Sequence, residues 1–168
     1  MTIFKIAGFT FLLFCLSCRE APQKDNATSA VSTLNNVSLY TLENDPIDMQ
    51  QYKGKTVFIN FWATWCKPCI REMPSIQKAM EILKEEDIVF LFATNDDLAA
   101  VKAFKNENEY DFEYVQVKNP EALEIESLPT TLIYDSEGAL RFSESGYRKW
   151  DKKRSVDQIL EIHYNNDK

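Results

Sequence analysis

Two stretches of the chain are mostly apolar and show no regular polar alternation. They cover residues 56–62 and 88–93 and are rich in Val, Ile, Leu and Phe. Runs of this kind are typical of strands that are buried on both faces of a sheet. A turn signal at 135–138, Asp-Ser-Glu-Gly, predicts a hairpin late in the chain. Shorter or weaker patterns predict further strands at 38–42, 114–117, 131–134 and 139–142.

Apolar residues at intervals of three and four predict helices between these strands. The longest series follows Cys66 and comprises Ile70, Met73, Ile76, Met80 and Leu83. The shorter helices are expected around 98–104, at 120–125, and along Val156, Ile159, Leu160 and His163. Strands that alternate with helices and end in a hairpin predict an α/β fold, with a central mixed sheet flanked by helices on both faces.

The first 36 residues follow a different pattern. Residues 6–16 form an apolar run whose helix would be about 16 Å long, too short for a bilayer core of about 30 Å. Such a run is typical of an export signal. Residues 19–36 are polar and rich in Ala, Ser, Thr and Asn, which indicates a flexible tether with a reach on the order of 25 Å. Packing of this segment on the domain through Val31 and Leu34 is the alternative.

Cys18 follows Leu16 and Ser17 at the end of the apolar run. This arrangement resembles a bacterial lipoprotein signal, which is cleaved before a cysteine that then carries the lipid. Cys15 stands where such signals usually have leucine. We therefore expect a signal peptide at 1–17, a lipidated Cys18 with a tether up to residue 36, and a folded domain at 37–168. An uncleaved anchor and an ordinary signal peptide are the alternatives.

Composition narrows the class of function. The chain has 168 residues, enough for one domain with a core, and a formal charge of -7, which argues against nucleic-acid binding. If Cys15 leaves with the signal and Cys18 carries lipid, only Cys66 and Cys69 remain in the domain. A disulfide across so short a loop constrains the unfolded chain by only about 2 kcal/mol. That small benefit favours redox chemistry over stapling.

Cys66 and Cys69 lie one helical turn apart, where the first buried strand gives way to the long helix. Free amides and the helix dipole at a helix N-terminus favour a thiolate, so Cys66 is the predicted nucleophile. Because Pro68 has no N–H, the amide of Cys69 is the expected donor to the Cys66 sulfur. Cys69 is expected to lie deeper and to resolve the mixed disulfide. An inert disulfide is the alternative, and a zinc site lacks ligands because the only histidine, His163, is far along the chain.

With these residues placed, the chain resembles the thioredoxin fold and, within it, the TlpA/ResA/DsbE-like branch of exported, membrane-tethered thiol–disulfide oxidoreductases. The resemblance covers residues 37–164. It is carried by Tyr52-Lys53-Gly54-Lys55, Asn60-Phe61-Trp62-Ala63-Thr64-Trp65-Cys66-Lys67-Pro68-Cys69, Glu72-Met73-Pro74 and Leu128-Pro129-Thr130-Thr131. It implies a monomeric, cofactor-free reductase of disulfides in exported proteins, lipid-anchored in the bacterial cell envelope, facing the periplasm and recharged by a membrane thiol carrier. Substrates in this branch include cytochrome c precursors.

The resemblance also implies roles for residues beside the dithiol. Lys67 and Pro68, between the two thiols, are expected to tune the redox potential, and a nearby lysine favours a thiolate. Pro129 resembles the family's cis-proline, which faces the dithiol and pairs with the substrate backbone. Leu128 and Thr130 flank it and are expected to contact substrate.

Glu72 follows Cys69 by one turn on the same helix face. It could accept the proton of Cys69 or raise the thiol pKa by like-charge repulsion. ResA-like proteins have a functional glutamate at this motif position, which implies a role as proton acceptor here; an exposed helix glutamate is the alternative. Asn60 replaces the buried aspartate of classical thioredoxins, a departure that favours the ResA-like branch. Trp65 is expected at the surface as a contact platform and Trp62 in the core.

Three other functions remain open at this point. An oxidase or isomerase would use the same thiols with a different redox potential. A peroxidase of the related peroxiredoxin family is disfavoured, because no Pro-x-x-x-Thr-x-x-Cys pattern surrounds Cys66. A binding module would use the groove around Trp65 and Pro129 to hold a partner without chemistry.

Overall fold

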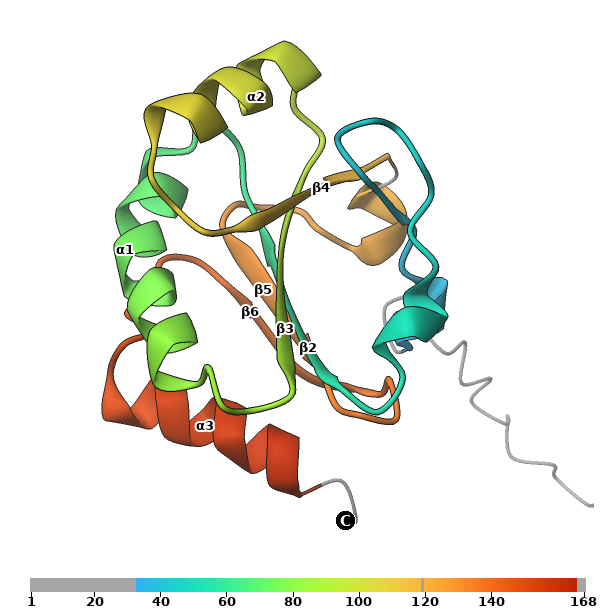
Figure 1. Ribbon diagram of the computed structural model, residues 1–168, viewed down its shortest axis with the longest axis vertical. Helices are drawn as coiled ribbons and strands as arrows, with labels where there is room; N and C mark the ends of the chain where they lie inside the picture. The colour runs from blue at the N-terminus through green and yellow to red at the C-terminus, as the bar shows by residue number, and fades with distance from the viewer. Residues whose placement is uncertain (1–32, 119, 166–168) are drawn as a thin grey trace, which may run out of the picture.

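The computed structural model describes residues 33–118 and 120–165 (Figure 1). The expected signal peptide and Cys18 lie outside these residues. One sheet is formed in the order β1-β4-β3-β2-β5-β6. Its strands are β1 (Leu39–Tyr40), β2 (Thr56–Phe61), β3 (Ile88–Thr94), β4 (Glu113–Val117), β5 (Thr130–Tyr134) and β6 (Leu140–Ser145). Three α-helices accompany them: α1 (Lys67–Ile82), α2 (Leu98–Glu107) and α3 (Lys153–Tyr164).

The strand directions are mixed, as predicted. The strands β2, β3 and β4 run parallel to one another, whereas β5 is antiparallel to β2, β6 to β5, and β1 to β4. In this register Phe61, the last residue of β2, pairs with Ala93 of β3 on one side and with Thr130 of β5 on the other. The end of the central strand is therefore bordered by the end of β3 and the beginning of β5.

The two faces of the sheet are covered differently. Phe58 of β2 points to a core formed with α1, α2 and α3, and the adjacent Val57 and Ile59 point to the opposite core. Both connections β2-α1-β3 and β3-α2-β4 step in the same direction across the sheet, so right-handed crossovers place both helices on one face. Figure 1 shows α1, α2 and α3 together on that side. Because both cores are apolar, every residue of β2 is buried, which explains its nearly continuous hydrophobic run.

The opposite face is covered by short 3₁₀ helices, η2 (Leu34–Asn36), η3 (Met49–Tyr52) and η4 (Pro120–Leu123). The segment 120–125, predicted as a short helix, thus takes the tighter 3₁₀ form. Helices cover both faces of the sheet as expected, but within the part of the chain that the structure describes the α-helices all lie on one face.

The last residues of the predicted tether pack on the domain. Leu34 is buried, and its N–H donates to the Gly138 carbonyl at 2.7 Å, while Thr33 bridges to Ala139. Gly138 has φ of +80°, and a Cβ there would lie 3.3 Å from that of Leu34. The apolar Leu34 side chain therefore covers the β5–β6 turn, and residues 33–36, predicted as part of the tether, pack on the domain.

Among the described residues, no helix has both the length and the apolar character that crossing a bilayer requires.

Candidate redox site

The two cysteines lie at the junction of β2 and α1. Cys66 caps the N-terminus of α1 and forms a disulfide with Cys69, with a Cα–Cα distance of 5.3 Å. The Cys69 N–H donates to the Cys66 sulfur at 3.3 Å, which is the donor that the absence of an N–H on Pro68 predicts. Cys66 is 4% exposed and Cys69 is fully buried, so an incoming sulfur meets Cys66 first. The geometry is that of a nucleophile at a helix N-terminus with a deeper partner.

Lys67 and Pro68 form the exposed first turn of α1. Lys67 directly follows Cys66 in the chain, and a positive charge near a thiol favours its thiolate form. Its effect on the redox potential remains a prediction.

Trp65 is held in place by Asp96, a residue that the sequence analysis did not identify. The indole ring is 71% exposed, and its Nε1–H donates to Asp96 Oδ1 at 3.0 Å. The other carboxylate oxygen of Asp96 accepts from the Thr64 backbone N–H at 2.6 Å and from the Thr64 hydroxyl at 2.8 Å. Three hydrogen bonds therefore fix the loop before Cys66, with an aromatic surface beside the dithiol. Trp62, by contrast, is buried against Phe104 and Tyr114, as expected for core.

A sequence signal for Asp96 existed. It lies just after the buried strand β3, whose carboxyl end lies beside that of β2 because the two strands are parallel. Polar residues at such strand ends commonly face the functional edge of a parallel sheet.

The proline loop borders the same strand end. The Leu128–Pro129 peptide bond is cis, the configuration that the resemblance predicts. Thr130 pairs with Phe61 across the sheet, which places Pro129 beside the loop that leads to Cys66. The Thr130 hydroxyl donates to the Ser127 carbonyl at 2.6 Å and lies 2.7 Å from the Ser145 hydroxyl. Its side chain thus braces the proline loop, and its predicted contact with substrate would have to come from the backbone. Leu128 is half-buried against both cores.

Glu72 is buried, so the alternative of an exposed helix glutamate is wrong. Its side chain lies on the inner face of α1 and is 1% exposed. The Asn60 side-chain amide donates to Oε1 at 2.8 Å, and the Arg148 backbone N–H donates to Oε2 at 3.1 Å. Within residues 33–118 and 120–165, no Lys, Arg or His side chain forms an ion pair with this carboxylate. Burial raises the pKa of Glu72 to about 7, and the hydrogen bonds from Arg148 and Asn60 oppose this rise in part.

Asn60 links this carboxyl group to the sheet. Its side-chain nitrogen also donates to Thr131 Oγ1 at 3.0 Å, whereas its Oδ1 has no hydrogen-bond partner in the part of the chain that the structure describes. An amide at this position can donate to Glu72, which the aspartate of classical thioredoxins could do only when protonated. Asn60, which stands where classical thioredoxins have aspartate, therefore forms one hydrogen-bonded polar group with the buried Glu72 and Thr131.

No three or more His, Cys, Asp or Glu side chains gather as a possible metal site within the described ranges. His163 instead accepts or donates a 3.0 Å hydrogen bond with the Thr56 hydroxyl at the other end of β2, consistent with a structural histidine.

Comparison with known proteins agrees with this geometry. Residues 32–143 match the AhpC/TSA family. The thiol-disulfide oxidoreductase ResA of Geobacillus kaustophilus is 32% identical over 140 residues, which cover 79% of each protein. ResA of Bacillus thuringiensis subsp. konkukian is 37% identical over 102 residues, and the match spans only 58% of each chain.

Structural comparison supports the fold. A thiol:disulfide interchange protein of the DsbE type from Chlorobium tepidum superposes with a TM-score of 0.69, over 78% of this chain and 96% of that one, at 19% identity. The family match at residues 32–143 includes Cys66, Cys69 and Glu72. The chain therefore belongs to the AhpC/TSA family, in the thioredoxin-like branch of the ResA-type thiol–disulfide oxidoreductases.

Proposed function

We propose that this protein is a thiol–disulfide oxidoreductase that reduces disulfides of exported proteins through Cys66 and Cys69. The observation that carries the proposal is the dithiol at the N-terminus of α1, with Cys66 at the surface side, Cys69 buried, and the buried carboxyl of Glu72 one turn further along the helix. Its relatives of the ResA type are named for this chemistry.

The first step is attack by the Cys66 thiolate on a substrate disulfide. A bond forms between the Cys66 sulfur and one substrate sulfur, the substrate S–S bond breaks, and the other substrate sulfur leaves as a thiolate that takes a proton from water. The N–H of Cys69 and the N-terminus of α1 stabilise the negative charge on Cys66 before the attack.

The second step releases the product. The Cys69 thiol gives its proton to the Glu72 carboxylate, and the resulting thiolate attacks the Cys66 sulfur. The Cys66–Cys69 bond forms, the mixed disulfide breaks, and the second substrate sulfur leaves as a thiolate. A carboxyl group with a pKa of about 7 is suited to accept this proton and return it near neutral pH. The substrate has gained two electrons, and the protein is left with the disulfide seen in the structure.

The surroundings of the dithiol supply the substrate surface. Trp65 offers an exposed aromatic face, Leu128 an apolar one, and the cis-proline loop at Pro129 a backbone edge for an extended peptide. Lys67 and Pro68 would tune the redox potential. These contacts suit a protein disulfide better than a small molecule.

The cellular setting follows from the sequence pattern and completes the proposal. Residues 1–17 would be the signal peptide, Cys18 the lipidated anchor, and the following segment a tether to a monomeric domain that faces the periplasm. Because that compartment is oxidising, a membrane thiol carrier must reduce the Cys66–Cys69 disulfide after each cycle. Precursors of cytochrome c are candidate substrates.

Two substitutions test the chemistry directly. Cys69→Ser should accumulate mixed disulfides with substrate proteins, because attack by Cys66 proceeds and release does not. Cys66→Ser should form none and should lose turnover. Full disulfide-reductase activity of Cys66→Ser would refute the assignment of Cys66 as nucleophile, whereas no activity in the native protein together with partner binding that survives Cys66→Ser would favour a binding module.

The redox potential decides whether the protein reduces substrate disulfides or donates its own disulfide to substrate thiols. The full chain, equilibrated in dithiothreitol or glutathione buffers, should show a reversible couple near or below about -270 mV, the value of thioredoxin. A value near about -120 mV, typical of strong oxidants, would make the protein a disulfide donor instead.

A further inference from the structure

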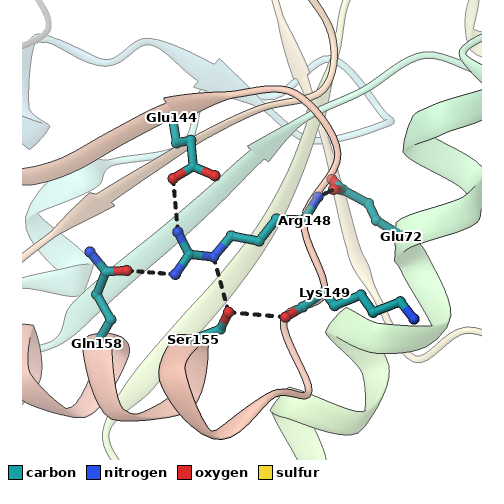
Figure 2. A network of polar contacts seen from close by, with 6 residues as sticks. All are labelled: Glu72, Glu144, Arg148, Lys149, Ser155 and Gln158. Carbon is teal, nitrogen blue, oxygen red and sulfur yellow. Dashed lines mark hydrogen bonds and ion pairs between the residues drawn. The ribbon is translucent and has the colours of Figure 1, made fainter.

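Arg148 makes an unusually complete set of side-chain contacts in the loop between β6 and α3. Its guanidinium donates to Ser155 Oγ at 3.0 Å, to Glu144 Oε2 at 2.8 Å and to Gln158 Oε1 at 2.6 Å (Figure 2). The group also lies 4.8 Å from the centre of the Trp150 ring. The side chain is only 15% exposed, so solvent competes little for these contacts.

The backbone N–H of the same residue faces the opposite way, toward Glu72. Figure 2 shows the guanidinium directed to β6 and α3 and the backbone nitrogen directed to Glu72. That N–H donates to Glu72 Oε2 at 3.1 Å. One residue thus joins the last helix of the domain to the buried carboxyl group of α1.

The neighbouring backbone is also tied down. The Gly146 N–H donates to the Pro129 carbonyl at 2.7 Å, and the Ser155 hydroxyl donates to the Lys149 carbonyl at 2.9 Å. The loop is therefore attached to the proline loop before Arg148 and to α3 after it. Its geometry at residue 148 depends on where α3 and β6 hold the guanidinium.

We propose that Arg148 is a positioning residue for the dithiol chemistry: its guanidinium anchors the loop to Glu144, Ser155 and Gln158, and this holds the backbone N–H of residue 148 against the Glu72 carboxylate. The inference rests on the proposed role of Glu72 as proton acceptor. Arg148 would touch neither thiol nor substrate and would act only through Glu72.

The electrostatics explain why position matters. A buried carboxylate is stabilised by each N–H that donates to it, as the Asn60 amide and the Arg148 N–H do here, and the Trp150 indole acts in the same direction. The groups that face Glu72 are these two, the Trp150 indole and, at longer range, the negative Glu144. Loosening residue 148 would remove one donor, and freeing Glu144 from its partner would add repulsion. Both effects favour the protonated form of Glu72.

The test is Arg148→Met in the full chain, which keeps the backbone N–H and much of the packing on Trp150 but removes the three anchors. The midpoint of Glu72, followed by ¹³C NMR of its carboxyl and assigned with Glu72→Gln, should rise by about half a pH unit or more. Product release should slow about twofold near pH 7 and be nearly unchanged near pH 9, where Glu72 is ionised in both proteins. A merely structural role would slow release equally at all pH values.

Three further variants complete the experiment. Lys153→Met removes an exposed ion pair with Asp157 on α3, the helix that also carries Ser155 and Gln158. This variant should leave the Glu72 midpoint unchanged. Glu144→Gln keeps a hydrogen-bond acceptor for Arg148 but removes the negative charge, so it should lower the Glu72 midpoint slightly. This variant separates the charge of Glu144 from its role as an anchor of Arg148. If Arg148→Met does not fold, Gln158→Leu should still raise the midpoint, because it removes one anchor.

The outcomes separate this inference from the proposed function. An unchanged Glu72 midpoint in folded Arg148→Met, or in Gln158→Leu if the former is unfolded, would overturn the positioning role. A Glu72→Gln variant with an unchanged pH profile of product release would instead refute the proton-acceptor role, while the NMR midpoint would still report whether Arg148 positions the carboxyl group.

Discussion

Two carboxyl groups, Glu72 and Asp135, are equally buried, at 1% exposure each, but they lie at opposite ends of the sheet. The register makes this clear, since the dithiol follows the end of β2 whereas Asp135 follows β5, whose last residue pairs with Val57 near the start of β2. Asp135 accepts hydrogen bonds from the backbone N–H groups of Glu137 and Ala139 and pairs with the Arg141 guanidinium. Glu72 accepts from two neutral donors, the Asn60 amide and the Arg148 N–H, and pairs with no cation among the described residues.

The difference shows how burial can serve either stability or chemistry. A buried carboxylate that pairs with a cation and accepts from two amides is well compensated and fixes the turn around it. A buried carboxylate with neutral donors alone is incompletely compensated, so its pKa rises to about 7. The second, Glu72, has a pKa suited to proton exchange near neutral pH, and it follows Cys69 by one turn of α1.

The largest effect expected from this comparison is on stability at the hairpin. Asp135→Ala removes a buried partner of Arg141 and leaves two turn amides without an acceptor, so the free energy of unfolding should fall by about 3–4 kcal/mol. Disulfide-reductase activity of the remaining folded protein should be unchanged. Glu137→Ala, an exposed residue of the same turn, is the matched control in denaturant titrations. If Asp135→Ala lost disulfide-reductase activity but kept its free energy of unfolding, Asp135 would serve the chemistry rather than stability, and the contrast with Glu72 would be wrong.

The second effect has the opposite sign and depends on pH. Because the folded pKa of Glu72 lies above its ordinary value of 4.5, folding favours the protonated form. The cost of ionising it is absent below pH 4.5, grows between pH 4.5 and about 7, and is fully present above that. Glu72→Gln should therefore be up to about 3 kcal/mol more stable than the native protein at pH 8.5 and nearly equal at pH 4.5.

Denaturant titrations of both proteins across this range would check that prediction. A constant difference in the free energy of unfolding from pH 4.5 to pH 8.5 would mean that Glu72 keeps its ordinary pKa. Release of product by Glu72→Gln should also lose its pH dependence near 7.

The smallest effect concerns a third carboxylate, which lies at the dithiol end but is only partly buried. Asp96→Ala frees the Trp65 indole and the Thr64 amide, so the aromatic surface should become mobile. The kcat/KM for a protein disulfide should fall about fivefold, corresponding to about 1 kcal/mol, and that for a small disulfide should change little. Asn95→Ala, at the exposed neighbour, is the control. Equal losses with both substrates would indicate a damaged dithiol rather than a displaced platform.

The sequence by itself determined the central strands, the long helix and the position of the dithiol. These features are local: β2 and β3 are apolar because both faces of the sheet are covered, α1 has apolar residues at helical spacing, and Cys66 caps it three residues before Cys69. Short elements were harder to predict. The strand β1 has only two residues, and η4 is a 3₁₀ turn, because edge segments are set by what they pack against rather than by their own pattern.

Only the tertiary structure decided how the dithiol is surrounded. The helical spacing of Glu72 is compatible with exposure or burial, and it is buried because β2 and the loop before α3 close over that side of α1. Its donors come from 12 and 76 residues away along the chain, and Asp96 lies 32 residues from Thr64. Contacts between segments so far apart leave no periodic signal in the sequence. The chain order specifies which groups carry the chemistry, while the packing of strands and helices decides which of them hold a charge and which can exchange a proton.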